Sequence, residues 1–327
     1  MGTVSMASVC VKIGLVAVAS VGMAATVNAM SFNTVSDCTA KLVAGADLKC
    51  KLSVGGHQRE FLLYAPANYD ASKPVALVVD AHGAYETDAE QAGLTPFQDW
   101  PSHLGSGFRL VADQQGFVVA QPQGLNNDWK SSSDVDFIMQ IPKFVEGIAS
   151  VDTKRVFLSG ISDGGQLVYW VGCQDTGTFR AFAGVSAFQS DTCALTRPAP
   201  MIHFHSPDDA VIGYSDGQDA FQAWVDASHC KSGPTNSMQF GGAGGDTRPF
   251  CLTATGNTWK LRGCIAASPA TKCQTSSQCD NDATSTFWTV SPDKVNHYAT
   301  TGGHILYING TSLSLAAVAW DFFNALK

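Results

Sequence analysis

The sequence predicts an α/β protein with a mainly parallel sheet and helices on both faces. Short, predominantly apolar runs such as 74–80 and 201–205 are typical of strands buried on both faces of a parallel sheet. Segments of helical periodicity alternate with these runs, as the crossover connections between parallel strands require. With 327 residues, 45% of them hydrophobic, the chain is long enough to bury one large core.

The first 29 residues are expected to be a secretory signal peptide. Lys12 precedes an apolar run over 13–25, and Val27-Asn28-Ala29 places small residues at the −3 and −1 positions of a cleavage site. The run is too short to span a bilayer comfortably, so no membrane span is expected. Residues 30–327 are then expected to form a single domain, secreted to the extracellular space or the periplasm.

Charge and composition exclude several classes of partner. The net charge is −8, and no cluster of Lys and Arg occurs anywhere in the chain. Nucleic acid and anionic membranes both require such clusters, so neither is an expected partner. A monomer is expected.

Nine of the ten cysteines follow residue 29. Because an exported chain forms disulfides by default, proximity favours the pairs Cys38 with Cys50 and Cys173 with Cys193. The other five, between 230 and 279, cannot be paired from the sequence, and one of the nine would stay unpaired. A zinc site is disfavoured because the chain has no C-x-x-C spacing.

The expected elements follow one another along the chain after a polar, disulfide-tied segment at 30–56 that packs on the edge of the domain. Hydrophobic residues at spacings of three and four indicate helices, as over 135–149. A further helix is expected whose last part is 108–115. Others are expected to cover 166–171, 214–230 and 313–326. Strands are expected at 59–64, 74–80, 116–120, 156–158, 181–187, 201–205 and 287–298.

Residues 231–284 interrupt this alternation. They combine a Gly-rich run at 241–245 with four cysteines and many Ser and Thr residues, and they show little periodicity. A loop of this length in a compact domain is usually functional or disordered. A disulfide-rich insertion near the site is therefore expected.

The apolar strand at 156–158 runs into Gly160-Ile-Ser-Asp-Gly164, which fits the G-x-S-x-G pattern of a nucleophile elbow. The glycines are expected for steric reasons, because a strained turn packed against a helix leaves no room for a Cβ atom. The pattern recurs by chance in a chain with 31 glycines. The strand before it and the helix expected after it give the pattern its weight.

A serine hydroxyl needs a base within hydrogen-bond reach and an acid that orients the base. The chain supplies candidates in the order Ser162, Asp, His. Asp208 and Asp209 follow the strand at 201–205, at the carboxyl end where open α/β sheets place their chemistry. His304 lies on a Gly-rich loop before the last helix, which favours it as the base.

Acyl transfer also needs hydrogen-bond donors for the developing oxyanion. The backbone N–H groups of Asp163 and Ala84 are the candidates, and His82 is expected to brace the loop that carries Ala84. His203 and His205 share a strand face and could hold a metal, but no third ligand is evident. Neither a metal nor a cofactor is expected.

Beyond the elbow pattern itself, a series of sequence segments along the chain carries a family resemblance. These segments are 59–66, 75–79 with His82-Gly83, 112–122, 134–138, 155–165, 182–184, 205–214 and 302–304. In this order they resemble the secreted polyhydroxybutyrate depolymerase and feruloyl esterase family of α/β-hydrolases. The resemblance covers about 58–230 and 285–326. It implies the α/β-hydrolase fold, with Ser162 as nucleophile, His304 as base and Asp209, four residues after His205, as acid.

The chain departs from that family at a few positions. Family members usually carry Asn or Ala where Asp163 stands, Gly where Ser206 stands and Gly where Asp136 stands. An acidic side chain beside the nucleophile could disfavour anionic substrates. The 231–284 segment is also unlike the family.

The resulting expectation is a secreted serine esterase that acts through an acyl-enzyme, most of all on hydroxyalkanoate polyester or its oligomers. The chain stops at Lys327 without the linker and binding module of polymer-degrading relatives, which favours soluble esters. One alternative is a feruloyl or acetyl esterase acting on plant cell-wall polysaccharides. An alternative of another class is a non-catalytic secreted binding protein on a hydrolase fold. Asn309-Gly-Thr311 is a glycosylation sequon only in a eukaryotic host.

Overall fold

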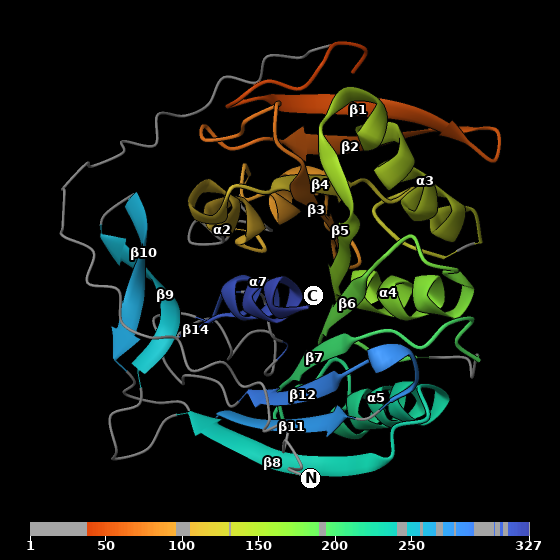
Figure 1. The fold of residues 1–327 in the computed structure, drawn as a ribbon, viewed down its shortest axis with the longest axis vertical. Helices are drawn as coiled ribbons and strands as arrows, with labels where there is room; N and C mark the ends of the chain where they lie inside the picture. Colours follow the sequence, from red (N-terminus) through yellow and green to blue (C-terminus); the bar gives the residue numbers. More distant parts are fainter. Residues whose placement is uncertain are drawn as a thin grey trace, which may run out of the picture.

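The computed structural model describes residues 38–95, 105–130, 132–189, 194–240, 247–255, 258–265, 271–277, 279–290, 304, 308–309 and 313–326. Ten strands of this part form one sheet in the order β1-β2-β4-β3-β5-β6-β7-β12-β11-β8 (Figure 1). The six strands in the middle of this sheet all run parallel to one another, as expected from their apolar sequences. They are β4 (Val118–Pro122), β3 (Val75–Ala81), β5 (Val151–Ile161), β6 (Ala181–Val185), β7 (Met201–His205) and β12 (Ser285–Val290).

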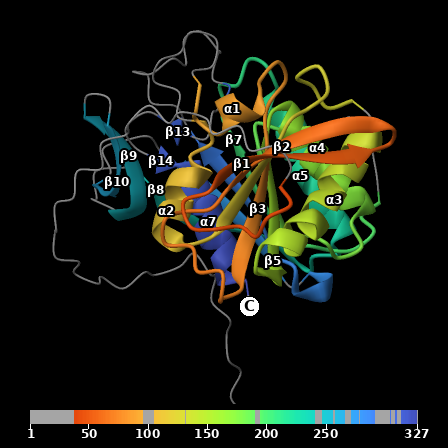
Figure 2. The same cartoon turned by 90° about the horizontal axis from the view of Figure 1, so that it is seen from above.

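Helices cover both faces of the sheet (Figures 1 and 2). One face carries α2 (Phe108–Gln115) and α7 (Leu315–Ala325), and the other carries α3 (Ser132–Ile148), α4 (Asp163–Gln174) and α5 (Tyr214–Ala227). Alternating strand residues feed two hydrophobic cores: Leu77 and Leu158 face α3 and α4, whereas Val78 and Phe157 face α2 and α7. No helix among the described residues combines the length and the apolar character needed to cross a bilayer.

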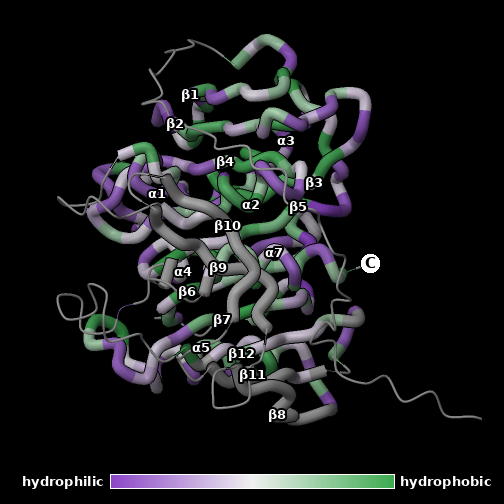
Figure 3. Tube along the Cα trace, turned by 90° about the vertical axis from the view of Figure 1, so that its left-hand side faces the viewer, coloured by the Kyte–Doolittle hydropathy of each residue, from purple (hydrophilic) through white to green (hydrophobic). Residues whose placement is uncertain are grey.

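In Figure 3 the hydrophobic residues, drawn in green, are concentrated along the strands β3 and β5 and along α2, which covers one face of the sheet. In the parallel pairing of β3 with β5, Ala81 lies opposite Gly160, so both strands end at the same edge of the sheet. β7 runs in the same direction beside β6. The residues that follow β3, β5 and β7 therefore meet at this carboxyl edge.

One edge of the sheet holds the N-terminal antiparallel pair β1 (Asp47–Val54) and β2 (His57–Tyr64). The predicted disulfide between Cys38 and Cys50 is present and ties this pair to the segment before it. The predicted signal peptide lies outside the described residues. Cys193 also lies outside them, so its pairing with Cys173 stays a prediction.

The interpretation of 231–284 as a long loop is wrong for the residues of this segment that the structure describes. β8 (Ser232–Phe240) and β11 (Thr271–Ser277) continue the sheet beyond β12 as antiparallel edge strands. Such strands need no continuous apolar run, so a Ser- and Thr-rich sequence conceals them. β9 (Thr247–Thr255) and β10 (Thr258–Ile265) form a separate hairpin, and β9 contacts α7 (Figure 1).

A second disulfide fastens this segment to the body of the protein. Cys230, just after α5, is bonded to Cys279, which precedes a short 3-10 helix over Asp280–Asp282. The segment therefore leaves and rejoins the body at a covalent link. Three short elements complete the described part: α1 (Asp88–Gln91), β13 (Ile308–Asn309) and β14 (Leu313–Ser314).

Candidate active site

Ser162 lies between the end of β5 and the first residue of α4. Its backbone has φ 53° and ψ −118°, a conformation that costs a residue with a Cβ atom energy and persists only where its surroundings impose it. Its N–H donates to the Val185 carbonyl over 2.9 Å, and its own carbonyl accepts from the Gln166 N–H over 2.9 Å. The sharp strand-to-helix turn predicted from the G-x-S-x-G pattern is therefore present.

The glycines around this turn are required by close backbone contacts. A Cβ atom on Gly160 would lie 2.2 Å from the Gly164 carbonyl oxygen, and one on Gly164 would lie 2.3 Å from the His82 carbonyl oxygen. The predicted steric reason for both glycines is confirmed. The loop after β3 also reaches the turn, since a Cβ atom on Gly83 would lie 3.4 Å from the Ser162 Cβ atom.

Asp209 and His304 are brought together although 95 residues separate them. The His304 Nδ1 atom lies 2.9 Å from Oδ2 and 3.1 Å from Oδ1 of Asp209. Because a carboxylate only accepts hydrogen bonds, this contact places the ring proton on Nδ1, and Nε2 carries the lone pair that a general base requires. Of the two aspartates proposed from the sequence, Asp209 makes this contact, whereas Asp208 is exposed.

The Asp209 carboxylate is held on its other side by the backbone. Its Oδ1 atom accepts from the N–H groups of Val211 over 2.9 Å and Ile212 over 3.0 Å. Burial opposes ionisation here, but the hydrogen bond from His304, the positive charge of that ring when it is protonated and the two N–H groups outweigh it and lower the pKa of Asp209. The carboxylate therefore stays ionised and fixes the orientation of the imidazole.

A buried series of hydrogen-bonded side chains lies behind Asp209, and it was not predicted from the sequence. The Tyr169 hydroxyl lies 2.8 Å from His203 Nδ1, and His203 Nε2 lies 3.1 Å from His205 Nδ1. His205 Nε2 lies 3.1 Å from the Ile212 carbonyl oxygen and 3.5 Å from Asp209 Oδ2. Since Nε2 must donate to that carbonyl, every donor in this series points the same way, from Tyr169 towards Asp209.

These contacts give His203 and His205 a structural role in place of the metal site considered from the sequence. Burial lowers the pKa of both histidines, so both rings stay neutral. Both nitrogens of each ring are engaged in hydrogen bonds. The described part of the chain contains no cluster of three His, Cys, Asp or Glu side chains arranged to hold a metal.

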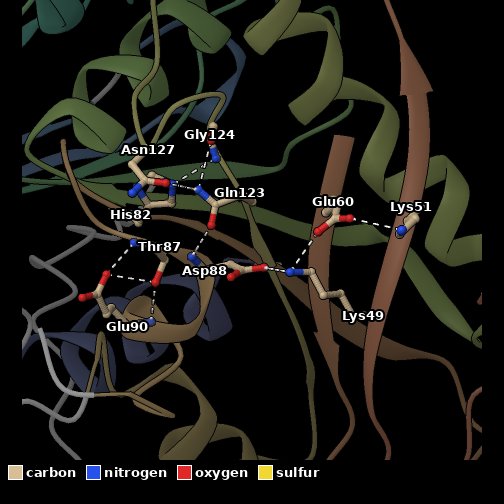
Figure 4. Close-up of polar contacts among 10 residues, drawn as sticks. All are labelled: Lys49, Lys51, Glu60, His82, Thr87, Asp88, Glu90, Gln123, Gly124 and Asn127. Atoms are coloured by element: carbon tan, nitrogen blue, oxygen red, sulfur yellow. Dashed lines mark hydrogen bonds and ion pairs between the residues drawn. The ribbon is translucent and has the colours of Figure 1, made fainter. Parts of the chain in front are cut away.

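On the opposite side of Ser162, His82 braces the loop after β3, as expected. The ring is fully buried, and its Nε2 atom accepts from the Gly124 N–H over 2.9 Å (Figure 4). Its Nδ1 atom donates to the Gly83 carbonyl over 2.6 Å. Burial lowers the pKa of His82 to about 4, which keeps the ring neutral. The Gly83 carbonyl is thereby fixed in direction.

The N–H groups on either side of Ala84 are already engaged. The Gly83 N–H donates to Glu86 Oε2 over 2.8 Å, and the Tyr85 N–H donates to the Asn127 carbonyl over 2.7 Å. This leaves the Ala84 N–H as the candidate oxyanion donor of the loop. The Asp163 N–H, in the first turn of α4, has no acceptor within its own helix and lies at the positive end of the helix dipole.

No protein-family model matches the chain. A 184-residue stretch is 29% identical to a bifunctional acetylxylan esterase/xylanase of Neocallimastix patriciarum and covers 54% of this chain but 25% of that protein. A 195-residue stretch is 29% identical to feruloyl esterase C of Emericella nidulans and covers 58% and 69% of the two chains. A probable feruloyl esterase C of Aspergillus niger is 28% identical over 200 residues, 59% and 72% of the two chains.

Among solved structures, an acetyl xylan esterase from Aspergillus awamori superimposes with a TM-score of 0.52 at 14% identity. The match covers 84% of this chain and 98% of that one. A likeness at this identity is one of fold, and it confirms the fold class expected from the sequence.

Proposed function

We propose that this α/β-hydrolase, a relative of feruloyl and acetylxylan esterases, is a secreted serine esterase. The observation that carries the proposal is the hydrogen bond of 2.9 Å between His304 and the buried carboxylate of Asp209. Asp209 and the strained Ser162 follow β7 and β5, which end at the same edge of the sheet. An oriented imidazole and a serine on a sharp strand-to-helix turn are two parts that acyl transfer requires.

In the proposed reaction, His304 Nε2 takes the proton of the Ser162 hydroxyl while the serine oxygen attacks the ester carbonyl carbon. The N–H groups of Ala84 and Asp163 stabilise the oxyanion of the tetrahedral intermediate. The protonated His304 then donates its proton to the departing alcohol, which leaves an acyl-enzyme. Water, activated by the same imidazole, releases the acid and restores Ser162. No step calls for a cofactor.

For the substrate, we favour feruloyl or acetyl esters of plant cell-wall polysaccharides. The relatives named above are, by their names, feruloyl and acetylxylan esterases, which supports this choice. The hydroxyalkanoate polyester preferred from the sequence alone receives no such support, so the alternative expectation replaces it. The partner of the proposed enzyme is accordingly a wall ester, and we propose that it acts as a monomer.

The test compares hydrolysis of methyl ferulate, acetylated xylan and hydroxybutyrate trimer by the purified protein. We expect turnover of at least one of the first two esters, and its loss in Ser162→Ala. The exposed Ser215 provides a matched control, since Ser215→Ala removes a hydroxyl from the surface of α5. Preference for the trimer would overturn the substrate assignment, and an inactive protein would favour the non-catalytic binding protein.

Secretion is part of the proposal and rests on disulfides. The bonds Cys38–Cys50 and Cys230–Cys279 form and persist in oxidising compartments. The predicted cleavage after Ala29 can be checked by sequencing the N-terminus of the exported protein. We expect it to begin at Met30, and recovery of an uncleaved chain from the cytosol would contradict secretion.

A further inference from the structure

Two carboxyl groups beside Ser162 share one hydrogen-bond donor. The Trp129 N–H lies 2.9 Å from Asp128 Oδ1 and 2.9 Å from Asp163 Oδ2. The shared donor therefore holds an oxygen of each carboxyl group close to the other. Two carboxylate charges held this close in a half-buried place would repel each other, so we expect the pair to keep one proton between its oxygens.

The segment that supplies Asp128 and Trp129 also holds the loop with the candidate oxyanion donor. The Trp129 ring N–H donates to the His82 carbonyl over 2.8 Å, and the Asn127 carbonyl accepts from the Tyr85 N–H over 2.7 Å. The Gly124 N–H donates to the His82 ring over 2.9 Å; Figure 4 shows Gly124 and Asn127 beside that ring. Segment 124–129 therefore grips the loop before and after Ala84.

We propose that Asp128 and Asp163 form a proton-sharing latch that holds segment 124–129, and through it the Ala84 loop, against the N-terminus of α4. The latch makes Asp128 and the side chain of Asp163 positioning groups for the oxyanion donors. The inference rests on the proposed esterase function. It goes beyond it because it assigns a task to the acidic side chain beside the nucleophile.

The charges around the latch agree with a single shared proton. Burial and the hydrogen bond to Asp128 raise the pKa of Asp163 to about 7. Burial alone would raise the pKa of Asp128 as well, but hydrogen bonds from Asp163 and Lys130 lower it. Lys130, paired with Asp128, is the cation that faces the pair, and its own side chain is largely exposed.

Two more titratable groups face the gripped loop from its other sides. The buried ring of His82 stays neutral, as described above. Glu86, whose carboxyl accepts from the Gly83 N–H, has its pKa raised to about 7 by burial. Ionisation of Glu86 would strengthen its hold on Gly83, because a charged acceptor makes the stronger hydrogen bond. Glu86 is therefore not expected to loosen the loop as the pH rises.

Loss of the shared proton has a direct consequence. Two carboxylates on one N–H repel each other in a half-buried place, so segment 124–129 and the N-terminus of α4 separate. A second negative charge there also opposes the developing oxyanion. We expect the rate of the proposed reaction to fall above pH 7, in addition to any loss on the acid side from protonation of His304.

The experiment measures kcat/KM for methyl ferulate between pH 5 and 9 in the wild type and three amide variants. In Asp163→Asn and Asp128→Asn, one amide replaces one carboxyl, keeps the hydrogen bonds and removes the second charge. Asp136→Asn, on the exposed side of α3, is the control with the same change of charge. We compare kcat/KM at pH 8.5 with kcat/KM at pH 6.5 in each protein. We expect this ratio to be about tenfold higher in both latch variants than in the wild type, since a factor of ten corresponds to about one pKa unit.

Equal ratios in all four proteins would overturn the latch. The latch would also be overturned if Glu86→Gln abolished the fall in kcat/KM above pH 7 while Asp163→Asn still showed it. An inactive wild type would overturn the proposed function, and thermal unfolding would then decide on the latch. Folded Asp163 keeps a proton that the unfolded chain has released, so wild-type stability falls from about pH 4 to pH 7. The Tm advantage of Asp163→Asn must grow over that interval, and a constant difference would contradict the latch.

Discussion

The two sides of Ser162 are built from buried polar groups of opposite kinds. On the acid-base side, neutral histidines stand in series behind one ionised carboxylate, Asp209. On the oxyanion side, the half-buried carboxyl group of Asp163 and the buried one of Glu86 accompany one neutral histidine, His82. Burial disfavours charge on both sides, so it lowers the pKa of the histidines and raises that of the carboxyls.

The difference links each side to pH with an opposite sign. His203 and His205 resist protonation in the folded protein, so their side loses stability as the pH falls below the ordinary histidine pKa of about 6.5. Asp163 and Glu86 resist deprotonation, so their side loses stability as the pH rises towards 7. Between about pH 4 and 7 the two pH dependences of stability therefore oppose each other.

The largest effect is expected on the acid-base side, from Asp209→Asn. The amide donates where the carboxylate accepted, so it favours the wrong tautomer of His304 and lowers kcat for methyl ferulate about 10⁴-fold. Asp208→Asn is the control, because Asp208 is exposed one residue away. Similar losses in the two variants would contradict the assignment of Asp209.

On the oxyanion side, the largest disruption of the geometry is expected from Gly164→Ala. The new Cβ atom would lie 2.3 Å from the His82 carbonyl oxygen, so α4 and the Ala84 loop must move apart. Loss of one oxyanion donor costs about 10²- to 10³-fold in kcat, and we expect a loss of that order. Gly147→Ala in α3 is the control, because a Cβ atom there meets nothing within 4 Å.

The variant Glu86→Gln tests the expected loss of stability on the oxyanion side as the pH rises. In the wild type, the raised pKa of Glu86 lowers the free energy of unfolding between about pH 4.5 and 7, by about 3 kcal/mol in total. The amide does not titrate, so that part of the pH dependence should vanish in urea unfolding at a series of pH values. If the variant keeps the wild-type slope, Glu86 does not carry this linkage.

The smallest effect is expected from Tyr169→Phe, which removes the first donor of the histidine chain. His203 Nδ1 is then buried without its partner, at a cost of about 1–3 kcal/mol in the free energy of unfolding. We expect the pH below which the variant loses stability to rise, since the unpaired nitrogen accepts a proton more readily. Tyr85→Phe removes an exposed hydroxyl and serves as the control.

The parts of the fold that local sequence determines were predicted well. The strand expected at 201–205 forms β7 with the same bounds, and the helix expected to end at 115 does so because Gly116 adopts φ 76°. The steric role of Gly160 and Gly164 followed from the turn alone. Such features depend on neighbours in the chain, which the sequence displays.

The supports of the site could not be predicted, because they depend on contacts between distant segments. Tyr169 reaches His203 across 34 residues, and Trp129 reaches Asp163 across the same separation. The spacing of Tyr169, seven residues after Ser162 on one helix, was the available signal for the first contact. No periodic pattern marks Asp128 or Trp129, and the departure at Asp163 was visible only as an anomaly without a partner.

The most direct test of the proposed mechanism is covalent trapping with a fluorophosphonate, followed by peptide mass spectrometry. An activated serine with an oriented base and an oxyanion site reacts with this reagent, whereas an ordinary surface serine does not. The mechanism predicts one adduct per chain, on the peptide that contains Ser162, formed slowly in Asp209→Asn and absent in Ser162→Ala. An unlabelled wild type, or an adduct on another serine, would contradict it.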